Sequence, residues 1–177
     1  RAAVARLAGR EQVQVISLQP TRLLHVLDDL ERVAHGIGRG NRGMQVRAEL
    51  QARIDAIAER ASGLFHRPRV VSLEWLDPLM LGGTWMPELI HAAGGLPVGA
   101  TAGEAAPTVL PQALLDLAPE VVLVKPCGFS CERTLAEREL LERTILPMLP
   151  AATRVYVSDG NAFFNRPGPR LVESLEI

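Results

Sequence analysis

Residues 120–124 read EVVLV, a short run in which every side chain after the first is apolar. A near-continuous apolar run of this length is typical of a strand in the buried middle of a parallel sheet. Two further runs rich in β-branched residues, RVVSLEW at 69–75 and RVYVS at 154–158, also predict strands. Helical patterns separate and follow these strands, at residues 86–93, 111–117, 131–148 and from 169 onward. The alternation of strands and helices predicts an α/β fold with a parallel sheet covered on both faces.

The chain ahead of residue 68 predicts one more strand and two helices. The strand is VQVISL at 13–18, and the helix after it has Thr21 as its N-cap. Four glycines between residues 36 and 43 end this helix, because a phosphate-binding glycine loop would precede a helix rather than follow one. The second helix is predicted from about Met44 to Ser62, with one apolar face. Its length of about 28 Å is enough to bridge two lobes, although an ordinary packing helix has the same periodicity.

The composition of the 177 residues excludes several classes of protein. With 47% hydrophobic and 22% charged residues, the chain is globular and neither disordered nor collagen-like. The net charge of −1 gives no sign of a nucleic-acid-binding face. No apolar run approaches the roughly 20 residues that span a bilayer. The chain opens at Arg1 without a signal peptide, and we expect that it is processed, trimmed or incomplete.

Large apolar side chains gather where the predicted strands end, although aromatic residues make up only 4% of the chain. Because ligands of open α/β sheets bind outside the carboxyl ends of the strands, these positions predict a ligand site. The alternative is that the same side chains cap the core beneath the loops. Two polar residues in the same region suit amide or phosphate groups of a ligand. The candidate ligand-binding residues are Trp75, Met80, Trp85, Phe129, Asn161, Phe163, Phe164 and Arg166.

The sequence contains no G-x-S-x-G, H-E-x-x-H or P-loop motif, so we predict no catalytic residues and no cofactor. Cys127 and Cys131 have three interpretations: small inert residues, a thiol activated at a helix N-terminus, or half of a zinc site. A zinc site would need a second cysteine pair or clustered histidines, which the sequence does not contain, so no metal site is predicted. Glu74 and Asp77 have the spacing of paired carboxylates for acid–base work, with a solvated loop as the simpler interpretation.

The segment NRPGPR at 165–170 places two arginines, Arg166 and Arg170, at the start of the last predicted helix. The dipole at a helix N-terminus disfavours cations, so this arrangement costs stability. We therefore expect an anionic ligand or partner near these two side chains.

Three segments of the chain together resemble the substrate-binding proteins of cobalamin-type ABC transporters. They are SLEWLDPLMLGGTWMPELIHAAGG at 72–95, VLVKPCGFSCERT at 122–134 and VYVSDGNAFFNRPGPRLVESLE at 155–176. The earlier VISLQP at 15–20 and the two helices after it resemble the end of a first lobe and a spanning helix. The resemblance implies two α/β, Rossmann-like lobes joined by one long helix, with the ligand held in the cleft between them.

The resemblance divides the chain into the end of a truncated first lobe at 1–43, a spanning helix at 44–67 and a C-terminal lobe at 68–177. The chain then carries half of the cleft. The implied function is noncatalytic binding of a corrinoid, cobalamin-like ligand and its delivery to an ABC-transporter permease, in the periplasm or at the cell surface. Haem and iron–siderophore complexes are the alternative ligands, and a thiol-dependent enzyme that uses Cys127 is the alternative function.

The resemblance also implies that acidic side chains dock on arginines of the permease. Glu88, in the segment WMPEL, is the candidate docking residue. Its alternative role is to compensate the dipole at the start of the predicted helix at 86–93. Contact with the membrane complex is then peripheral, and no nucleic acid is expected as a partner.

Overall fold

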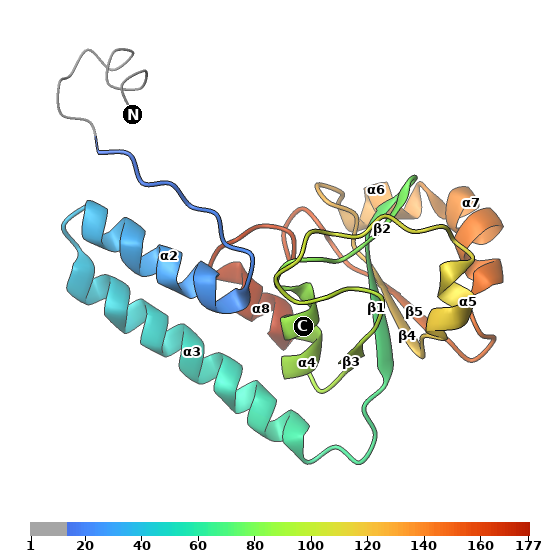
Figure 1. The fold of residues 1–177 in the computed structure, drawn as a ribbon, viewed down its shortest axis with the longest axis horizontal. Helices are drawn as coiled ribbons and strands as arrows, with labels where there is room; N and C mark the ends of the chain where they lie inside the picture. The colour runs from blue at the N-terminus through green and yellow to red at the C-terminus, as the bar shows by residue number, and fades with distance from the viewer. Residues whose placement is uncertain (1–13) are drawn as a thin grey trace, which may run out of the picture.

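The computed structural model describes residues 14–177, and a five-stranded sheet organises the later part of the chain (Figure 1). The main strands β1 (Arg69–Leu76), β4 (Val121–Val124) and β5 (Arg154–Val157) run parallel, in the spatial order β1-β4-β5. The short strand β3 (Leu96–Pro97) joins β1 in parallel, and β2 (Leu79–Leu81) pairs with β1 in the antiparallel direction. The predicted α/β fold with a mainly parallel sheet is confirmed.

Each face of the sheet buries its own apolar cluster. Val71 of β1 and Val122 of β4 point to one face and are completely buried. Val70 and Leu123, one residue out of phase with them, pack on the opposite face. Successive side chains of a strand alternate between faces, so a sheet covered on both sides requires strands without polar interruptions. This requirement explains the near-continuous apolar run that predicts β4.

Helices cover the two faces of the sheet, in agreement with the prediction. α4 (Met86–Ala92) and α8 (Arg170–Glu176) lie on one face. α5 (Ala113–Leu117), α6 (Cys131–Leu135) and α7 (Arg138–Leu140) lie on the other (Figure 1). The sheet is therefore the middle layer between two helical layers.

The segment predicted to be helical at 131–148 is helical over most of its length, but it is divided into several pieces, with a turn between α6 and α7 at residues 136–137. After α7 the chain forms a wide π turn (Leu141–Ile145) and then a 3₁₀ turn (Leu146–Met148). The hydroxyl of Thr144 donates to the carbonyl of Leu140 at 2.6 Å, and such bonds from a side chain to the preceding turn bend helices. The wide turn buries its first and last side chains against the sheet.

Two antiparallel helices lie beside the sheet domain (Figure 1). They are α2 (Leu23–Gly36) and α3 (Gly40–Ser62). α3 has 23 residues and is about 34 Å long. It begins at Gly40, earlier than the predicted start at Met44. α3 packs against α4 and α8, and the helical pair shares one apolar cluster with that face of the sheet. The proposed division of the chain at residues 43 and 67 stays a prediction.

Gly43 lies inside α3 and allows the two helices to approach closely. A Cβ at this position would stand 2.5 Å from the Cβ of Ala34 in α2. The prediction that all four glycines between 36 and 43 end a helix is therefore correct for Gly36, the last residue of α2, and wrong for Gly43. A small residue in a helix interior has the same appearance in the sequence whether it ends the helix or packs against a neighbour.

The N-terminus of α2 is capped by a residue that is distant in the sequence. The predicted cap, Thr21, is wrong, because Arg22 occupies the N-cap position and makes no side-chain cap bond. Oε2 of Glu88, in α4, instead accepts the N–H of Leu23 at 2.7 Å, and Oε1 lies 3.7 Å from Nε of Arg22. α2 is thereby tied to the first turn of α4.

The strand predicted at 13–18 is wrong for the part of it that the structure describes. Residue 13 lies outside the described residues, and residues 14–18 have no regular secondary structure. A strand needs a neighbouring strand to pair its backbone N–H and C=O groups. Among residues 14–177, no strand pairs with this segment.

Candidate ligand-binding site

Three loops meet at the carboxyl edge of the sheet, one after each of β1, β4 and β5. The N–H of Cys127, after β4, donates to the carbonyl of Glu74 near the end of β1 at 2.9 Å. The N–H of Asn161, after β5, donates to the carbonyl of Phe129 at 3.0 Å. These bonds hold the loops side by side and bring together residues that are far apart in the sequence. Open α/β sheets bind ligands at this edge.

Trp75 near the end of β1, Phe129 in the loop after β4 and Arg133 in α6 form a surface that we call the aromatic wall. The rings of Trp75 and Phe129 meet edge to face, with centroids 5.3 Å apart and an interplanar angle of 66°. The guanidinium of Arg133, in α6, lies 4.6 Å from the centroid of the Phe129 ring. Both rings are partly exposed. The sequence prediction included the two aromatic residues and missed Arg133, since nothing in its helical spacing indicates a contact with Phe129.

Met80 lies beside the aromatic wall, in a strand rather than in the predicted loop. The segment after β1 forms β2, in which Met80 is paired with Trp75 across the antiparallel ladder. Residues paired in this way project their side chains from the same face of the sheet. The prediction of an irregular loop at this place is wrong, whereas the proximity of Met80 to Trp75 supports its place in the candidate site.

The loop after β5 brings further polar side chains to the carboxyl edge, and its Asn161 is bonded through the backbone to Phe129. Nη2 of Arg166 donates to Oδ1 of Asn161 at 2.9 Å. The ring of Phe163 is partly exposed and has the guanidinium of Arg170 at 5.1 Å from its centroid. Arg170 is also paired with Glu173 at 3.3 Å, so a carboxylate of its own helix compensates its charge. A cavity of about 480 Å³ is lined by this segment, including Asn161, Phe163, Arg166 and Arg170, and the residues of the aromatic wall are not part of its lining.

Trp85 and Phe164 belong to the apolar core, although Phe164 also lines the cavity of about 480 Å³. They are 8% and 7% exposed and pack in the cluster between α4, α8 and the helical pair. The indole N–H of Trp85 donates to the carbonyl of Phe164 at 2.7 Å. Two roles are expected from the sequence for the aromatic residues near strand ends, ligand contact and capping of the core. The packing of Trp85 and Phe164 agrees with capping of the core. Contact of either residue with a ligand stays a prediction.

The acidic candidates have partners within the molecule. Glu88 caps α2 through Leu23, and its docking on a permease stays a prediction. The carboxylate of Glu74 lies 3.8 Å from Nζ of Lys125, so its partner is a cation and not a second carboxylate. Asp77 is exposed and accepts the indole N–H of Trp75 with its backbone carbonyl. The described contacts therefore give no support to an acid–base pair of Glu74 and Asp77.

Sequence analysis missed Lys125 and Asn165, which lie beneath the three loops. Lys125 directly follows β4, is 0% exposed and donates from Nζ to Oδ1 of Asn165 at 2.6 Å. Burial lowers the pKa of Lys125 to about 8, while the nearby Glu74 and Cys127 act in the opposite direction. A lysine at a strand end normally reaches solvent, so its position in the sequence does not reveal this burial.

Cys127 is exposed, Cys131 is partly buried, and both are free thiols. Cys131 is the first residue of α6, and Ser130 caps this helix by accepting the N–H of Arg133 at 3.2 Å. Among residues 14–177, no group of three or more His, Cys, Asp and Glu side chains is placed to hold a metal ion.

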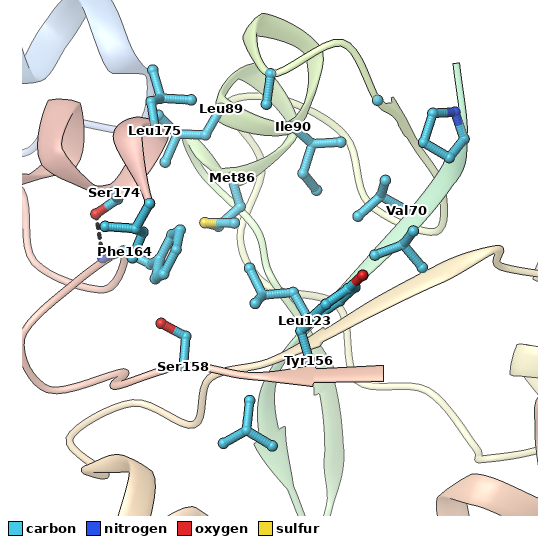
Figure 2. Close-up of a pocket in the computed structure, with 16 residues that line it drawn as sticks. Val70, Met86, Leu89, Ile90, Leu123, Tyr156, Ser158, Phe164, Ser174 and Leu175 are labelled. Atoms are coloured by element: carbon cyan, nitrogen blue, oxygen red, sulfur yellow. Dashed lines mark hydrogen bonds between the residues drawn. The ribbon is translucent and has the colours of Figure 1, made fainter. Parts of the chain in front are cut away.

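A second, apolar cavity of about 570 Å³ lies between the sheet and the helices α4 and α8 (Figure 2). Figure 2 shows Leu123 and Tyr156 of the sheet facing Met86 of α4 across it. The hydroxyl of Ser174, on its α8 side, is already engaged, because it accepts the N–H of Phe164 and donates to the carbonyl of Arg170. Ligand sites need a few free polar groups for orientation. The hydroxyl-bearing side chains of Tyr156 and Ser158 also line this cavity, so it is not without polar groups. We take the carboxyl edge as the stronger candidate because ligands of open α/β sheets bind there and because it carries partly exposed aromatic rings.

The chain belongs to the periplasmic binding protein family, whose sequence model matches residues 6–161. The members of this family are substrate-binding proteins of transport systems, which are not enzymes. They bind small molecules and work with ABC-transporter permeases, in the periplasm or at the cell surface. Among residues 14–177, no helix is both long and apolar enough to cross a membrane. No match was found among curated proteins.

Solved structures similar to this chain include several binding proteins. The periplasmic haem-binding protein RhuT from Roseiflexus sp. RS-1 is 25% identical with a TM-score of 0.76, over 98% of this chain and 67% of RhuT. An ABC-transporter substrate-binding protein from Listeria monocytogenes EGD-e is 17% identical with a TM-score of 0.80, over 99% and 69% of the two chains. The vitamin B12-binding protein BtuF of Vibrio cholerae is 18% identical with a TM-score of 0.67, over 99% and 66%. This chain thus spans about two thirds of their length.

Proposed function

We propose that this chain supplies one wall of the cleft of a substrate-binding protein that captures a corrinoid, cobalamin-like ligand and delivers it to an ABC-transporter permease. Haem and iron–siderophore complexes are the alternative ligands. The similarity to a haem-binding protein and to a vitamin B12-binding protein supports a metal-centred macrocycle as the ligand class. Family membership supports the transport role.

The aromatic wall at the carboxyl edge is the observation that carries this proposal. A flat macrocycle offers large apolar faces, which stack on aromatic rings with little loss of side-chain entropy. Trp75, near the end of β1, and Phe129, in the loop after β4, present partly exposed rings that meet edge to face. Arg166, in the third loop, offers a guanidinium to carboxylate, amide or phosphate groups at the ligand's edge.

The ligand class is testable because the candidate ligands are coloured. Cyanocobalamin, hemin and ferrioxamine B are each mixed with the intact protein and passed through a gel-filtration column. We expect cyanocobalamin to elute with the protein as a red band. Co-elution of hemin or ferrioxamine B in its place would replace the corrinoid by that alternative, and separation of all three from the protein would contradict the proposal.

A further inference from the structure

Lys125 occupies the point at which the three strand-end loops meet. Its side chain is completely buried, and Nζ donates to Oδ1 of Asn165, in the loop after β5, at 2.6 Å. Oε2 of Glu74, near the end of β1, lies 3.8 Å from the same ammonium group. Because Lys125 itself begins the loop after β4, one side chain connects all three segments that carry the candidate ligand contacts.

Asn165 extends this network to the backbone. Its Nδ2 donates to the carbonyls of Lys125 and Gly160, both at 2.9 Å. Gly160 packs so closely that a Cβ there would lie 2.1 Å from the carbonyl oxygen of Pro126. The loop after β5 therefore rests directly on the backbone that follows β4. The oxygen of the Asn165 amide accepts from Lys125, and this bond holds the amide in the orientation that both carbonyls require.

Burial of the Lys125 ammonium group costs free energy. Removing the charge from water is unfavourable, and the attraction of a partner at 3.8 Å offsets only part of the loss. The groups that face the ammonium are Glu74 from β1, Cys127 from its own loop and Asn165 from the loop after β5. An apolar side chain of similar volume would avoid this cost, but it would leave the amide oxygen of Asn165 without its donor. What the lysine supplies, and an apolar side chain does not, is a directed bond to the loop after β5.

We propose that Lys125 is a positioning residue, which fixes the loops after β1, β4 and β5 relative to one another and so sets the geometry of the candidate ligand site. This inference rests on the proposed function, because it concerns the same loops. Trp75 adjoins Glu74, Phe129 lies in the loop that Lys125 begins, and Arg166 adjoins the asparagine that accepts from the ammonium. Each anchor of the network is therefore close in sequence to a candidate ligand contact.

The variant Lys125→Met tests the proposal in the intact protein, because it removes the charge and keeps an unbranched side chain. The first readouts are urea unfolding at pH 7 and the Kd of cyanocobalamin, or of hemin if hemin is the ligand that co-elutes. Removal of the buried charge and loss of the bond to Asn165 change stability in opposite directions, so urea unfolding serves to show that the variant is folded under the binding conditions. In the folded variant we expect a Kd raised about tenfold. The matched control, Arg138→Met, removes an exposed charge on α7 and leaves the Kd unchanged. A wild-type Kd for the folded Lys125→Met protein overturns the proposal.

Amide hydrogen exchange gives a second readout that needs no ligand. The N–H groups of Cys127 and Asn161 bridge neighbouring loops, and we expect both to exchange about tenfold faster in Lys125→Met than in the wild type. Because this result does not depend on any ligand, it separates a failure of the positioning role from a failure of the proposed function. If Lys125→Met does not fold, Asn165→Ala removes the acceptor of the same bond and carries the same expectation. Unchanged exchange at both amides overturns the proposal.

Discussion

The ammonium group of Lys125 has a pKa of about 8 in the folded chain, below the ordinary lysine value of 10.5. Between these two pH values the unfolded chain binds more protons than the folded chain, so the free energy of unfolding rises with pH. Below pH 8 Lys125 is protonated in the folded chain, so the full desolvation cost of its ammonium group lowers the free energy of unfolding.

We predict that the wild type gains up to about 3 kcal/mol of stability relative to Lys125→Met between pH 8 and 10.5. Urea unfolding of both proteins across this range measures the difference, and subtraction removes the contribution of other titrating groups. A difference that stays constant with pH would show that the lysine is not desolvated in the fold.

The burial of individual side chains at the site is not predictable from the sequence pattern. Trp75 and Trp85 both lie close to the end of β1 in the sequence, yet Trp75 reaches the surface and Trp85 is buried under α8 and the helical pair. The pattern that predicts a strand end carries no information about what packs on top of it. The role of Lys125 depends on Glu74 and Asn165, which come from two other segments, so only the tertiary structure reveals it.

Among the helices, Glu88 joins α4 to α2 and is the candidate docking residue. Glu88→Ala removes the acceptor of the Leu23 N–H, and we expect it to lower stability by about 0.5–2 kcal/mol. Glu88→Gln keeps an acceptor oxygen, so a smaller loss is expected. Thermal unfolding of the two variants measures this difference.

The same two variants test the docking role separately from the capping role. Both lose the negative charge, so docking through Glu88 predicts an equal decrease in transporter-stimulated ATP hydrolysis for Glu88→Ala and Glu88→Gln, which deepens with added salt. Normal stimulation by the stable Glu88→Gln protein would remove this residue from the permease interface.

The close approach of α2 and α3 depends on Gly43. Gly43→Ala places a methyl group 2.5 Å from the Cβ of Ala34, and we expect a loss of about 1–3 kcal/mol despite the better helix propensity of alanine. Gly63→Ala is the matched control, because a Cβ there meets nothing within 4 Å and its φ is −83°. We expect this control to be neutral or to stabilise the protein by about 0.4–1 kcal/mol. Equal effects of the two substitutions, measured by urea unfolding, would show that the helices do not pack as the structure describes.

The elements that sequence analysis predicts correctly are those with a strong local pattern. β1, β4 and β5 are runs of β-branched residues that need no partner to be identified. β2 has three residues between proline and glycine, so it forms only because β1 offers it an edge to pair with. The segment at 13–18 has the same local pattern as a strand, and no strand pairs with its described part. Strand formation depends on a partner, which local sequence does not contain.

In the whole molecule, the position of the ligand is the central question. Two cavities of the described residues bear on this question. One is lined by the loop after β5 at the carboxyl edge, and the other is the apolar cavity behind α4 and α8 in Figure 2. The resemblance to two-lobed binding proteins predicts the first, because the strand ends face a cleft in that architecture. The proposed function requires that ligand affinity depend on residues of the carboxyl edge and not on residues of the apolar cavity.

Calorimetric titration of Trp75→Ala, Phe129→Ala and Tyr156→Ala with cyanocobalamin, or with hemin if hemin co-elutes, tests this requirement most directly. Tyr156 is the matched control: it is an aromatic residue of β5, 51% exposed, that lines the apolar cavity. The account predicts that the Kd rises about 2- to 10-fold for Trp75→Ala and for Phe129→Ala, and stays at the wild-type value for Tyr156→Ala. Wild-type affinity in the first two variants, with weaker binding by Tyr156→Ala, would contradict the account and place the ligand between the sheet and α4.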